Sequence, residues 1–290
     1  MSRRLTFFLT VLAMLAFAGN SLLCRLALKH TSIDAASFTT IRILSGALML
    51  GLIVRVRGGS HGIAGSWPSA LMLFAYAAGF SYAYISLPAA TGAMLLFGAV
   101  QATMISIGLW TGERIAMRQS VGLVCALAGL VWLLLPGLSA PPLLGSILML
   151  SAGIAWGIYS LRGKGAGDPI AVTAGNFLRA VPMALVLSIT MLRSHSLDRS
   201  GVVFAVASGA LASGLGYAVW YTALRGLKAT SAATVQLSVP ILAALGGIIF
   251  LGEAISLRLL IASVAILGGI ALVIIERTPA RPPCPESKHD

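Results

Sequence analysis

Long runs of apolar residues, separated by short polar joints, dominate this chain of 290 residues. A bilayer core about 30 Å thick needs about 20 residues of helix to cross it. Ten runs reach about that length between charged residues, glycines and prolines. We therefore predict ten membrane-spanning helices, at Leu5–Lys29, Ile33–Arg55, Ser66–Leu87, Ala89–Trp110, Arg118–Pro136, Pro142–Leu161, Pro169–Leu192, Gly201–Leu224, Ala229–Leu251 and Leu257–Glu276.

The joints between these runs are short, and they carry glycine, proline or charge. None is long enough to hold a soluble domain. Residues 277–290 contain four prolines and few apolar residues, so we predict a disordered tail there. At the other end, Arg3-Arg4, an apolar stretch and Ala16-Phe17-Ala18 imitate a signal peptide. The run continues to Leu28, which favours an uncleaved first helix.

Successive joints lie on opposite sides of the membrane, and Lys and Arg residues are distributed unevenly between these two sides. With the N-terminus inside, most of the 20 Lys and Arg residues fall on the cytoplasmic side. Cytoplasmic joints of membrane proteins carry such an excess of positive charge. We therefore expect a multi-pass protein of a bacterial inner membrane with both termini in the cytoplasm.

Composition supports a membrane protein and argues against several other classes. Hydrophobic residues make up 58% and charged residues 10% of the chain, too apolar for a soluble domain of this size. The net charge of +12 forms no basic patch or arm, so we expect no nucleic-acid partner. Cys24, Cys125 and Cys284 have neither metal nor redox spacing, and we expect no metal and no cofactor.

The two halves of the chain resemble one another. Gly112-Glu113 recurs as Gly252-Glu253, and Gly129 as Gly269, at a spacing of 140 residues. Nearer the start of each half, Arg42 matches Arg179, Gly79 matches Gly216 and Tyr84 matches Tyr221 at a spacing of 137 residues. Each half holds five spans, an odd number, so the second half is inverted across the membrane. Inverted repeats are typical of carriers that open a central site alternately to either side.

Residues 91–131 and 231–271 carry a family resemblance, above all in Val239-Pro240-Ile241 followed by Leu251-Gly252-Glu253. They resemble the paired EamA repeats of the drug/metabolite transporter superfamily, and the chain looks most like the YddG-type exporters of aromatic and other amino acids. The first half departs from the pattern, with Val100 where the second has Pro240. The resemblance implies an all-α polytopic membrane protein, with ten helices around a central cavity. We take residues 1–136 as the first repeat, 142–276 as the second and 277–290 as a cytoplasmic tail.

Ionisable side chains are nearly absent from the middle of the predicted spans. All eight carboxylates and four histidines fall at span ends, in joints or in the tail. A proton-coupled carrier usually needs a buried group that titrates near neutral pH, so we expect facilitated transport without proton coupling. Glu113 and Glu253 lie beside Arg114 and near Arg258, and we interpret both as capping or loop-pairing residues. No span holds a nucleophile with a base or a metal-ligand cluster, so we predict no catalytic residue and no enzyme.

Arg42 and Arg179 lie well inside their predicted spans. A guanidinium in such a place can hold a substrate carboxylate through paired hydrogen bonds. It can equally bond backbone carbonyl groups where helices pack. Both interpretations stay open, and we name these two residues as possible carboxylate anchors.

Aromatic and amide side chains at depth supply the other candidates for a substrate site. Aromatic rings offer stacking surface and hydroxyl groups, although a ring near a span end can also belong to the interfacial belt. Amides inside a membrane bond across helices or face a wet cavity. The candidate cavity residues are Asn20, Tyr76, Phe80, Tyr84, Gln101, Trp156, Tyr159, Tyr217, Tyr221 and Gln236. Tyr84 and Tyr221 fall toward opposite faces, which suits gates on either side of a site.

The sequence therefore predicts an inner-membrane exporter of amino acids, aromatic ones included, that works by alternating access. Its partners would be a small-molecule substrate and the lipid bilayer, with monomer or homo-oligomer left open. Two alternatives remain: an exporter of drugs or other small metabolites, and a membrane assembly protein that transports nothing.

Overall fold

The computed structural model describes residues 2–58, 64–110, 117–137, 140–163, 167–227 and 235–274, which are almost entirely helical. Glu113 and Cys284 lie outside the described residues. The helices are α1 (Arg3–His30), α2 (Ala35–Val56), α3 (Trp67–Tyr84), α4 (Ala89–Trp110), α5 (Met117–Leu134), α6 (Leu143–Gly163), α7 (Pro169–Thr190), the short η1 (Leu192–Ser194), α8 (Arg199–Val206), η2 (Ala207–Leu215), α9 (Gly216–Leu224), α11 (Ser238–Leu251) and α12 (Leu257–Ile274).

Most of the helices follow the predicted spans closely. The exception is α11, which begins at Ser238 and not at Ala229; residues 228–234 lie outside the described residues. The segments α8, η2 and α9 run on without a break and form one helix of 26 residues, Arg199–Leu224. Seven helices are long and apolar enough to cross a membrane, and α11 and α12 are shorter apolar helices within the described residues. The helix α3 is not among the seven, because it carries three tyrosines, a tryptophan and two serines. The protein is thus a multi-pass helical membrane protein, and the full count of ten crossings stays a prediction.

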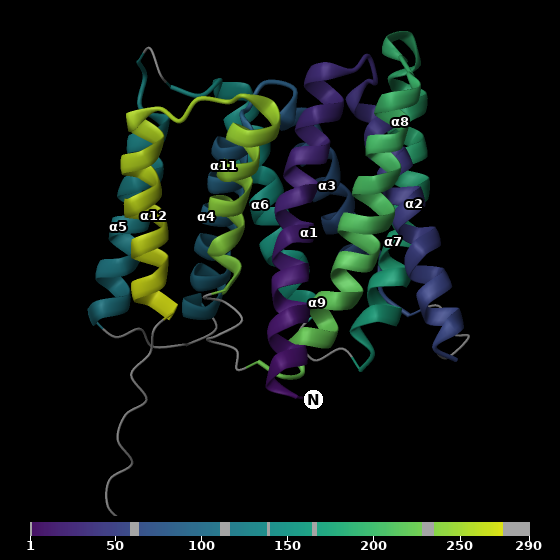
Figure 1. Cartoon of the computed structure of the whole chain (residues 1–290), viewed down its shortest axis with the longest axis horizontal. Helices are drawn as coiled ribbons and strands as arrows, with labels where there is room; N and C mark the ends of the chain where they lie inside the picture. Colours follow the sequence, from purple (N-terminus) through teal and green to yellow (C-terminus); the bar gives the residue numbers. More distant parts are fainter. Residues whose placement is uncertain are drawn as a thin grey trace, which may run out of the picture.

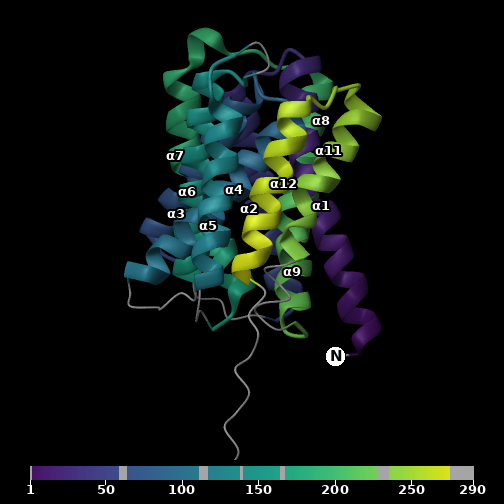
Figure 2. The same cartoon turned by 90° about the vertical axis from the view of Figure 1, so that its left-hand side faces the viewer.

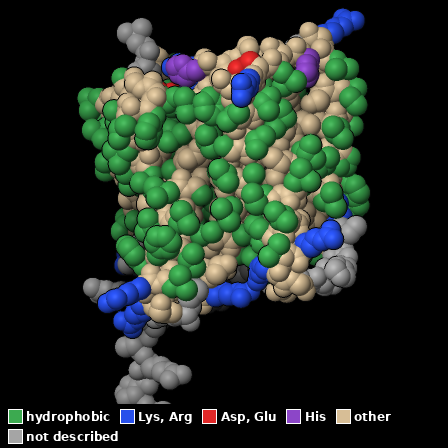
Figure 3. All heavy atoms as spheres, turned by 45° about the vertical axis from the view of Figure 1, so that its right-hand side comes forward, with side chains coloured by type: hydrophobic (Ala, Val, Ile, Leu, Met, Phe, Trp, Pro, Cys, Tyr) green, Lys and Arg blue, Asp and Glu red, His purple; other side chains and the backbone are tan. Residues whose placement is uncertain are grey.

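The long helices stand side by side and alternate in direction between two ends (Figures 1 and 2). The basic end, drawn at the bottom, holds Arg3, Arg4, Arg55, Arg57 and Arg225. The far end, drawn at the top, holds the joints between α1 and α2, between α3 and α4, and between α11 and α12. Apolar side chains cover the face between the ends, and most of the visible Lys and Arg side chains lie along its lower edge (Figure 3). This surface fits a bilayer.

Packing between the helices is reciprocal. The helix α3 packs on α6, and in the other half α8, η2 and α9 pack on α1. In the same way, α4 packs on α6 and α11 packs on α1. The helices α2 and α7 pack on each other, as do α5 and α12. At the α5–α12 contact, a Cβ at Gly129 would lie 2.8 Å from the Cβ of Ala265, so a glycine is needed for this approach.

One helix departs from α geometry. The segment η2 is a π-helix, and it lies against α2 and α1. A Cβ at Gly209 would overlap the main-chain oxygen of Arg42, so only glycine allows this contact. Segments of π-helix in membrane and soluble proteins often mark functional sites. Here the wide turn brings Ser208 to the side chain of Asn20, with 2.6 Å between Ser208 Oγ and Asn20 Oδ1.

Candidate functional site: a cavity between the two halves

A cavity of about 510 Å³ lies between helices of the two halves. Its volume falls in the range of sites for small molecules. Helices α1, α3 and α4 contribute one part of the wall, and α6, η2 and α9 contribute most of the other. The lining residues are Phe17, Asn20, Ser21, Tyr76, Phe80, Leu96, Phe97, Val100, Gln101, Met104, Trp156, Ser160, Leu161, Gly163, Pro169, Ala212, Tyr217, Trp220, Tyr221, Leu224 and Gln236.

The cavity reaches the basic end of the molecule. Gly163 at the end of α6, Pro169 at the start of α7 and Leu224 at the end of α9 are among its lining residues. Toward the far end the lining stops at Ser21 and Phe80. The cavity therefore runs from the middle of the bundle toward the basic end.

Aromatic rings form one continuous wall of the cavity. Trp156 lies at its centre, with its ring centroid 4.7 Å from that of Tyr76 and 5.3 Å from that of Tyr217. Phe17 meets Tyr217 edge to face at 5.8 Å. These separations are typical of favourable aromatic pairs, so the rings hold one another in place. The wall offers flat apolar faces to a ligand, with hydroxyl groups at its edges.

A polar network lies at the inner end of this wall. Arg42, only 2% exposed, donates from Nη2 to the hydroxyl oxygen of Tyr76 at 3.0 Å. The Asn20 amide donates to the same oxygen at 3.4 Å, and Asn20 itself accepts from Ser208. The guanidinium carbon of Arg42 lies 4.8 Å from the ring centroid of Phe80, so the ring also stabilises the charge.

The Tyr76 hydroxyl has a free proton to offer. A phenolic oxygen has two lone pairs and one O–H, and here the lone pairs accept from Arg42 and Asn20. Because Tyr76 lines the cavity, its O–H can be donated to a ligand. Behind it, Arg42 Nη1 is buried and has no hydrogen-bond partner. The single ion pair among the described residues lies elsewhere, so Arg42 brings an uncompensated positive charge close to the cavity.

Most of the sequence-predicted cavity residues lie together in this lining. Asn20, Tyr76, Phe80, Gln101, Trp156, Tyr217, Tyr221 and Gln236 all belong to it. Tyr159 does not, because it stacks behind Trp156 at 5.3 Å and accepts a hydrogen bond from Asn176. Tyr84 also lies outside the lining, fully buried near the far end, with its hydroxyl 3.4 Å from the main-chain oxygen of Ala89.

The two arginines at matched positions have different surroundings. Arg42 lies behind Tyr76 and Phe80, one side chain away from the cavity. Arg179 instead donates to the main-chain oxygens of Ala64 and Gly175, and so ties the chain before α3 to α7. Arg179 therefore shows the packing arrangement, in which a guanidinium bonds backbone carbonyls.

Sequence reasoning did not bring together two charged residues at the far end, Arg25 and Glu253. Arg25 lies within the predicted span Leu5–Lys29 but was given no role there; it is a buried residue of α1, and it pairs with Glu253. Glu253 does cap a helix and pair with an arginine, but the partner is Arg25 and not the nearby Arg258. The position of Arg25 inside an unbroken apolar run was the one available signal. Within the described residues, no three His, Cys, Asp or Glu side chains gather as a metal site would require.

A bundle of apolar helices around a cavity is an arrangement typical of membrane transport proteins. Residues 143–275 match the model of the EamA-like transporter family, and the chain belongs to this family. It is 58% identical to an uncharacterized protein of Pseudomonas aeruginosa over 96% of this chain and 97% of that protein.

Two further similarities concern exporters and the fold. The threonine/homoserine exporters RhtA of Salmonella typhimurium and Escherichia coli are 35% identical, and the match spans 47% of this chain and 48%, about half, of theirs. A crystal structure with 20% identity covers 94% of this chain with a TM-score of 0.68, which supports the fold alone. The family and the named relatives are transporters and not enzymes, which implies a small-molecule substrate and a membrane location.

Proposed function

We propose that the protein exports amino acids, aromatic ones included, across a bacterial inner membrane by alternating access. Its basic end would face the cytoplasm, with both chain termini on that side, in accord with the rule for positive charge. The reciprocal packing of α1 to α5 with α6 to α12 supports two inverted repeats, residues 1–136 and 142–276. The cavity, which reaches the basic end, would then accept its substrate from the cytoplasm.

The observation that carries the substrate class is the Tyr76 hydroxyl backed by Arg42. An amino acid presents a carboxylate, and a Tyr O–H whose oxygen accepts from a guanidinium is a strengthened donor for it. The aromatic wall formed by Trp156 and Tyr217 can stack on an apolar or aromatic side chain. The same features support a specificity like that of YddG-type exporters. Export of threonine and homoserine, named for the RhtA relatives, points to the same class of substrate.

Transport without proton coupling is part of this proposal. None of the described residues that line the cavity is acidic or a histidine. The cavity wall there lacks a side chain that titrates near neutral pH, which a proton-coupled site usually needs. The gradient of the amino acid itself would then drive export.

Counterflow of labelled threonine, phenylalanine and methionine into liposomes that hold the purified protein tests the proposal. We expect saturable exchange, unchanged when a pH gradient is imposed. Saturable exchange of drug-like or other metabolites with none of amino acids would favour the alternative substrates. No exchange of any solute by folded protein would favour a membrane assembly protein.

The role of Tyr76 has its own test. In Tyr76→Phe the substrate carboxylate loses the hydrogen bond that the Tyr76 O–H donates. Because the carboxylate is charged, this bond is worth about 1.5–3 kcal/mol, so KM should rise at least about tenfold. Tyr82→Phe is the matched control, because Tyr82 lies on the same helix but outside the lining. An unchanged KM in Tyr76→Phe would remove Tyr76 from the site while leaving the carrier assignment in place.

A further inference from the structure

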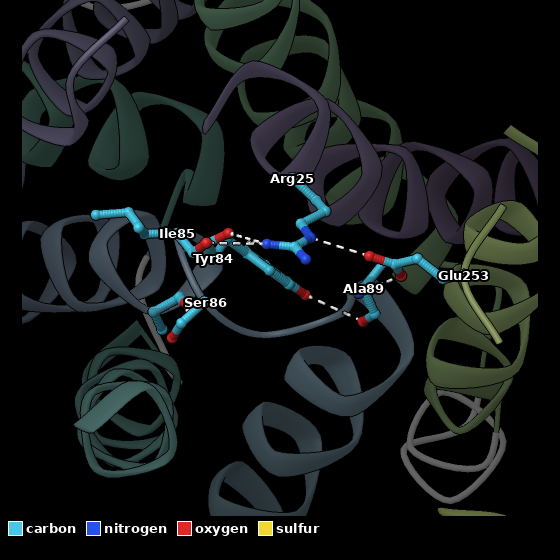
Figure 4. Close-up of polar contacts among 7 residues, drawn as sticks. Arg25, Tyr84, Ile85, Ser86, Ala89 and Glu253 are labelled. Atoms are coloured by element: carbon cyan, nitrogen blue, oxygen red, sulfur yellow. Dashed lines mark hydrogen bonds and ion pairs between the residues drawn. The ribbon is translucent and has the colours of Figure 1, made fainter. Parts of the chain in front are cut away.

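Beyond the far end of the cavity lies a cluster that we name the far-end latch: the side chains of Arg25 and Glu253 and the main chain of Tyr84, Ile85 and Ala89 (Figure 4). Arg25 Nε donates to Glu253 Oε1 at 2.9 Å. Arg25 Nη1 donates to the main-chain oxygens of Tyr84 and Ile85 at 2.9 and 3.0 Å. Glu253 Oε2 accepts from the main-chain nitrogen of Ala89 at 2.7 Å. These bonds join α1, the end of α3, the start of α4 and the chain after α11.

Local sequence at the end of α11 aims Glu253 into the latch. Gly252 has a φ of +62°, the left-handed conformation in which glycine ends helices. This turn lets the Glu253 main-chain nitrogen donate to the oxygen of Gly247 at 3.0 Å. A Cβ at Gly247 would lie 3.0 Å from Glu253 Oε2, so the glycine also leaves room for the carboxylate. The carboxylate then sits at the start of α4, where the helix dipole favours negative charge.

The latch is buried, although its partners are charged. The side chains of Arg25 and Glu253 are only 7% and 8% exposed. A buried ion pair gains little net stability, because the cost of removing two charges from water offsets their attraction. Such a pair can therefore exchange at small cost for two hydrated side chains if the far end opens to water. A purely apolar contact of similar area would instead lose the free energy of its burial when the far end opened to water.

The position of the latch relates it directly to the cavity. Phe80, where the lining ends, meets Tyr84 edge to face at 4.7 Å, and the Tyr84 main chain is held by Arg25. Helices α1, α3 and α4, which the latch joins, are also cavity walls. A path from the cavity to the far end between these helices would require the bonds of Arg25 and Glu253 to separate.

We propose that Arg25 and Glu253 are positioning residues for transport, which hold the cavity shut at the far end and part once in each cycle. The proposal rests on transport by alternating access and is independent of the substrate's identity. Weakening the latch shifts the protein toward a state whose cavity opens at the far end. The turnover of exchange falls, because the closed state on that side becomes harder to reach, whereas the KM changes less than it does in Tyr76→Phe.

Labelling of one cavity residue from each side of the membrane tests the latch. The reporter is Val100→Cys, a lining position, in a chain with Cys24→Ala, Cys125→Ala and Cys284→Ala. A membrane-impermeant maleimide is applied to right-side-out and inverted vesicles. Exposed cysteines placed by Lys29→Cys at the far end and Arg225→Cys at the basic end identify the two faces.

With the latch intact, we expect labelling mainly from the basic face. Glu253→Gln, which removes the charge and keeps the shape, should raise the rate from the far face at least about fivefold and lower it from the basic face. Arg25→Gln should do the same. Arg193→Gln is the matched control, because it removes an exposed arginine at the far end, and it should change neither rate.

An unchanged far-face rate in folded Glu253→Gln and Arg25→Gln would overturn the proposal and leave the pair as a static structural contact. If these variants do not fold, Gly247→Ala serves instead, since it keeps both charges and displaces the carboxylate. A shift in labelling without amino-acid counterflow would retain the latch and refute the proposed substrate. Counterflow without a shift would retain the substrate and refute the latch.

Discussion

The two ends of the bundle carry equivalent residues in opposite arrangements. Arg25 at the far end and Arg162 at the basic end are separated by the same 137 residues as Arg42 and Arg179. Arg25 is buried and paired with Glu253, whereas Arg162 is exposed and donates to the Ser69 hydroxyl at 3.2 Å.

The tyrosines of the two ends differ in the same sense. Tyr84 is fully buried next to the far-end latch, whereas its counterpart Tyr221 is partly exposed and lines the cavity. Residues at matched positions of the two halves are therefore buried at the far end and more exposed at the basic end. This difference is what the proposed inverted repeats would show, because in carriers of that kind the two halves exchange roles as the central site opens alternately to either side.

The largest expected effect comes from breaking the closed end. Arg25→Gln leaves the buried Glu253 without its partner, and removal of one member of a buried pair costs about 3–5 kcal/mol. We expect a clear fall in the thermal unfolding midpoint in detergent. Arg162→Gln removes an exposed arginine and should leave the midpoint within about one degree, since exposed interactions contribute little. Equal falls for both variants would mean that the two ends do not differ as described.

The KM measured in counterflow should distinguish Arg42 from Arg179, the two arginines at matched positions. Arg42→Gln weakens the Tyr76 hydroxyl as a donor to the substrate carboxylate, so KM in counterflow should rise about tenfold with little loss of stability. Arg179→Gln removes the bonds to Ala64 and Gly175, so it should lower the unfolding midpoint and leave KM nearly unchanged. A KM that rises in Arg179→Gln and not in Arg42→Gln would contradict this and make Arg179 the anchor of the substrate carboxylate.

The smallest expected effect is on stability, from a substitution that fills the space beside Glu253. In Gly247→Ala the new methyl group displaces the carboxylate, and we expect roughly 1 kcal/mol less stability than in Gly268→Ala, about the value of one hydrogen bond. Gly268→Ala is the control, because nothing lies within 4 Å of its Cβ, and alanine there should be neutral or slightly stabilising. Thermal unfolding of both variants measures the difference. Equal midpoints would show that the carboxylate moves without cost.

Much of the fold could be predicted because apolar run length alone fixes helices in a membrane. The prediction of Ala89–Trp110 coincides with α4, and α1, α2 and α6 differ from their predicted bounds by one or two residues at each end. The π-helix η2 could not be predicted, because no local residue pattern marks a wide turn. It depends on how Gly209 packs against the main chain of Arg42, a contact between distant parts of the sequence.

Membership of the cavity lining could be predicted where depth alone decides what a side chain contacts. Aromatic and amide residues near the middle of a span, such as Asn20 and Phe80, line the cavity. Arg42 and Arg179 have the same depth and could not be told apart, since the contacts that separate them come from Tyr76 and from the chain before α3. Glu253 was paired with the wrong arginine because its partner lies more than 200 residues away along the chain.

Distances across both ends, measured by electron spin resonance on one protein, test the central claim most directly. Spin labels at Lys29 and Ile255 report on the far end, and labels at Arg162 and Arg225 report on the basic end; all four side chains are exposed. On addition of an amino acid that the protein exchanges, we expect the far-end distance to lengthen in part of the population while the basic-end distance shortens in the same proportion. Distances that stay fixed at both ends during active exchange, or that change in the same direction, would contradict the account.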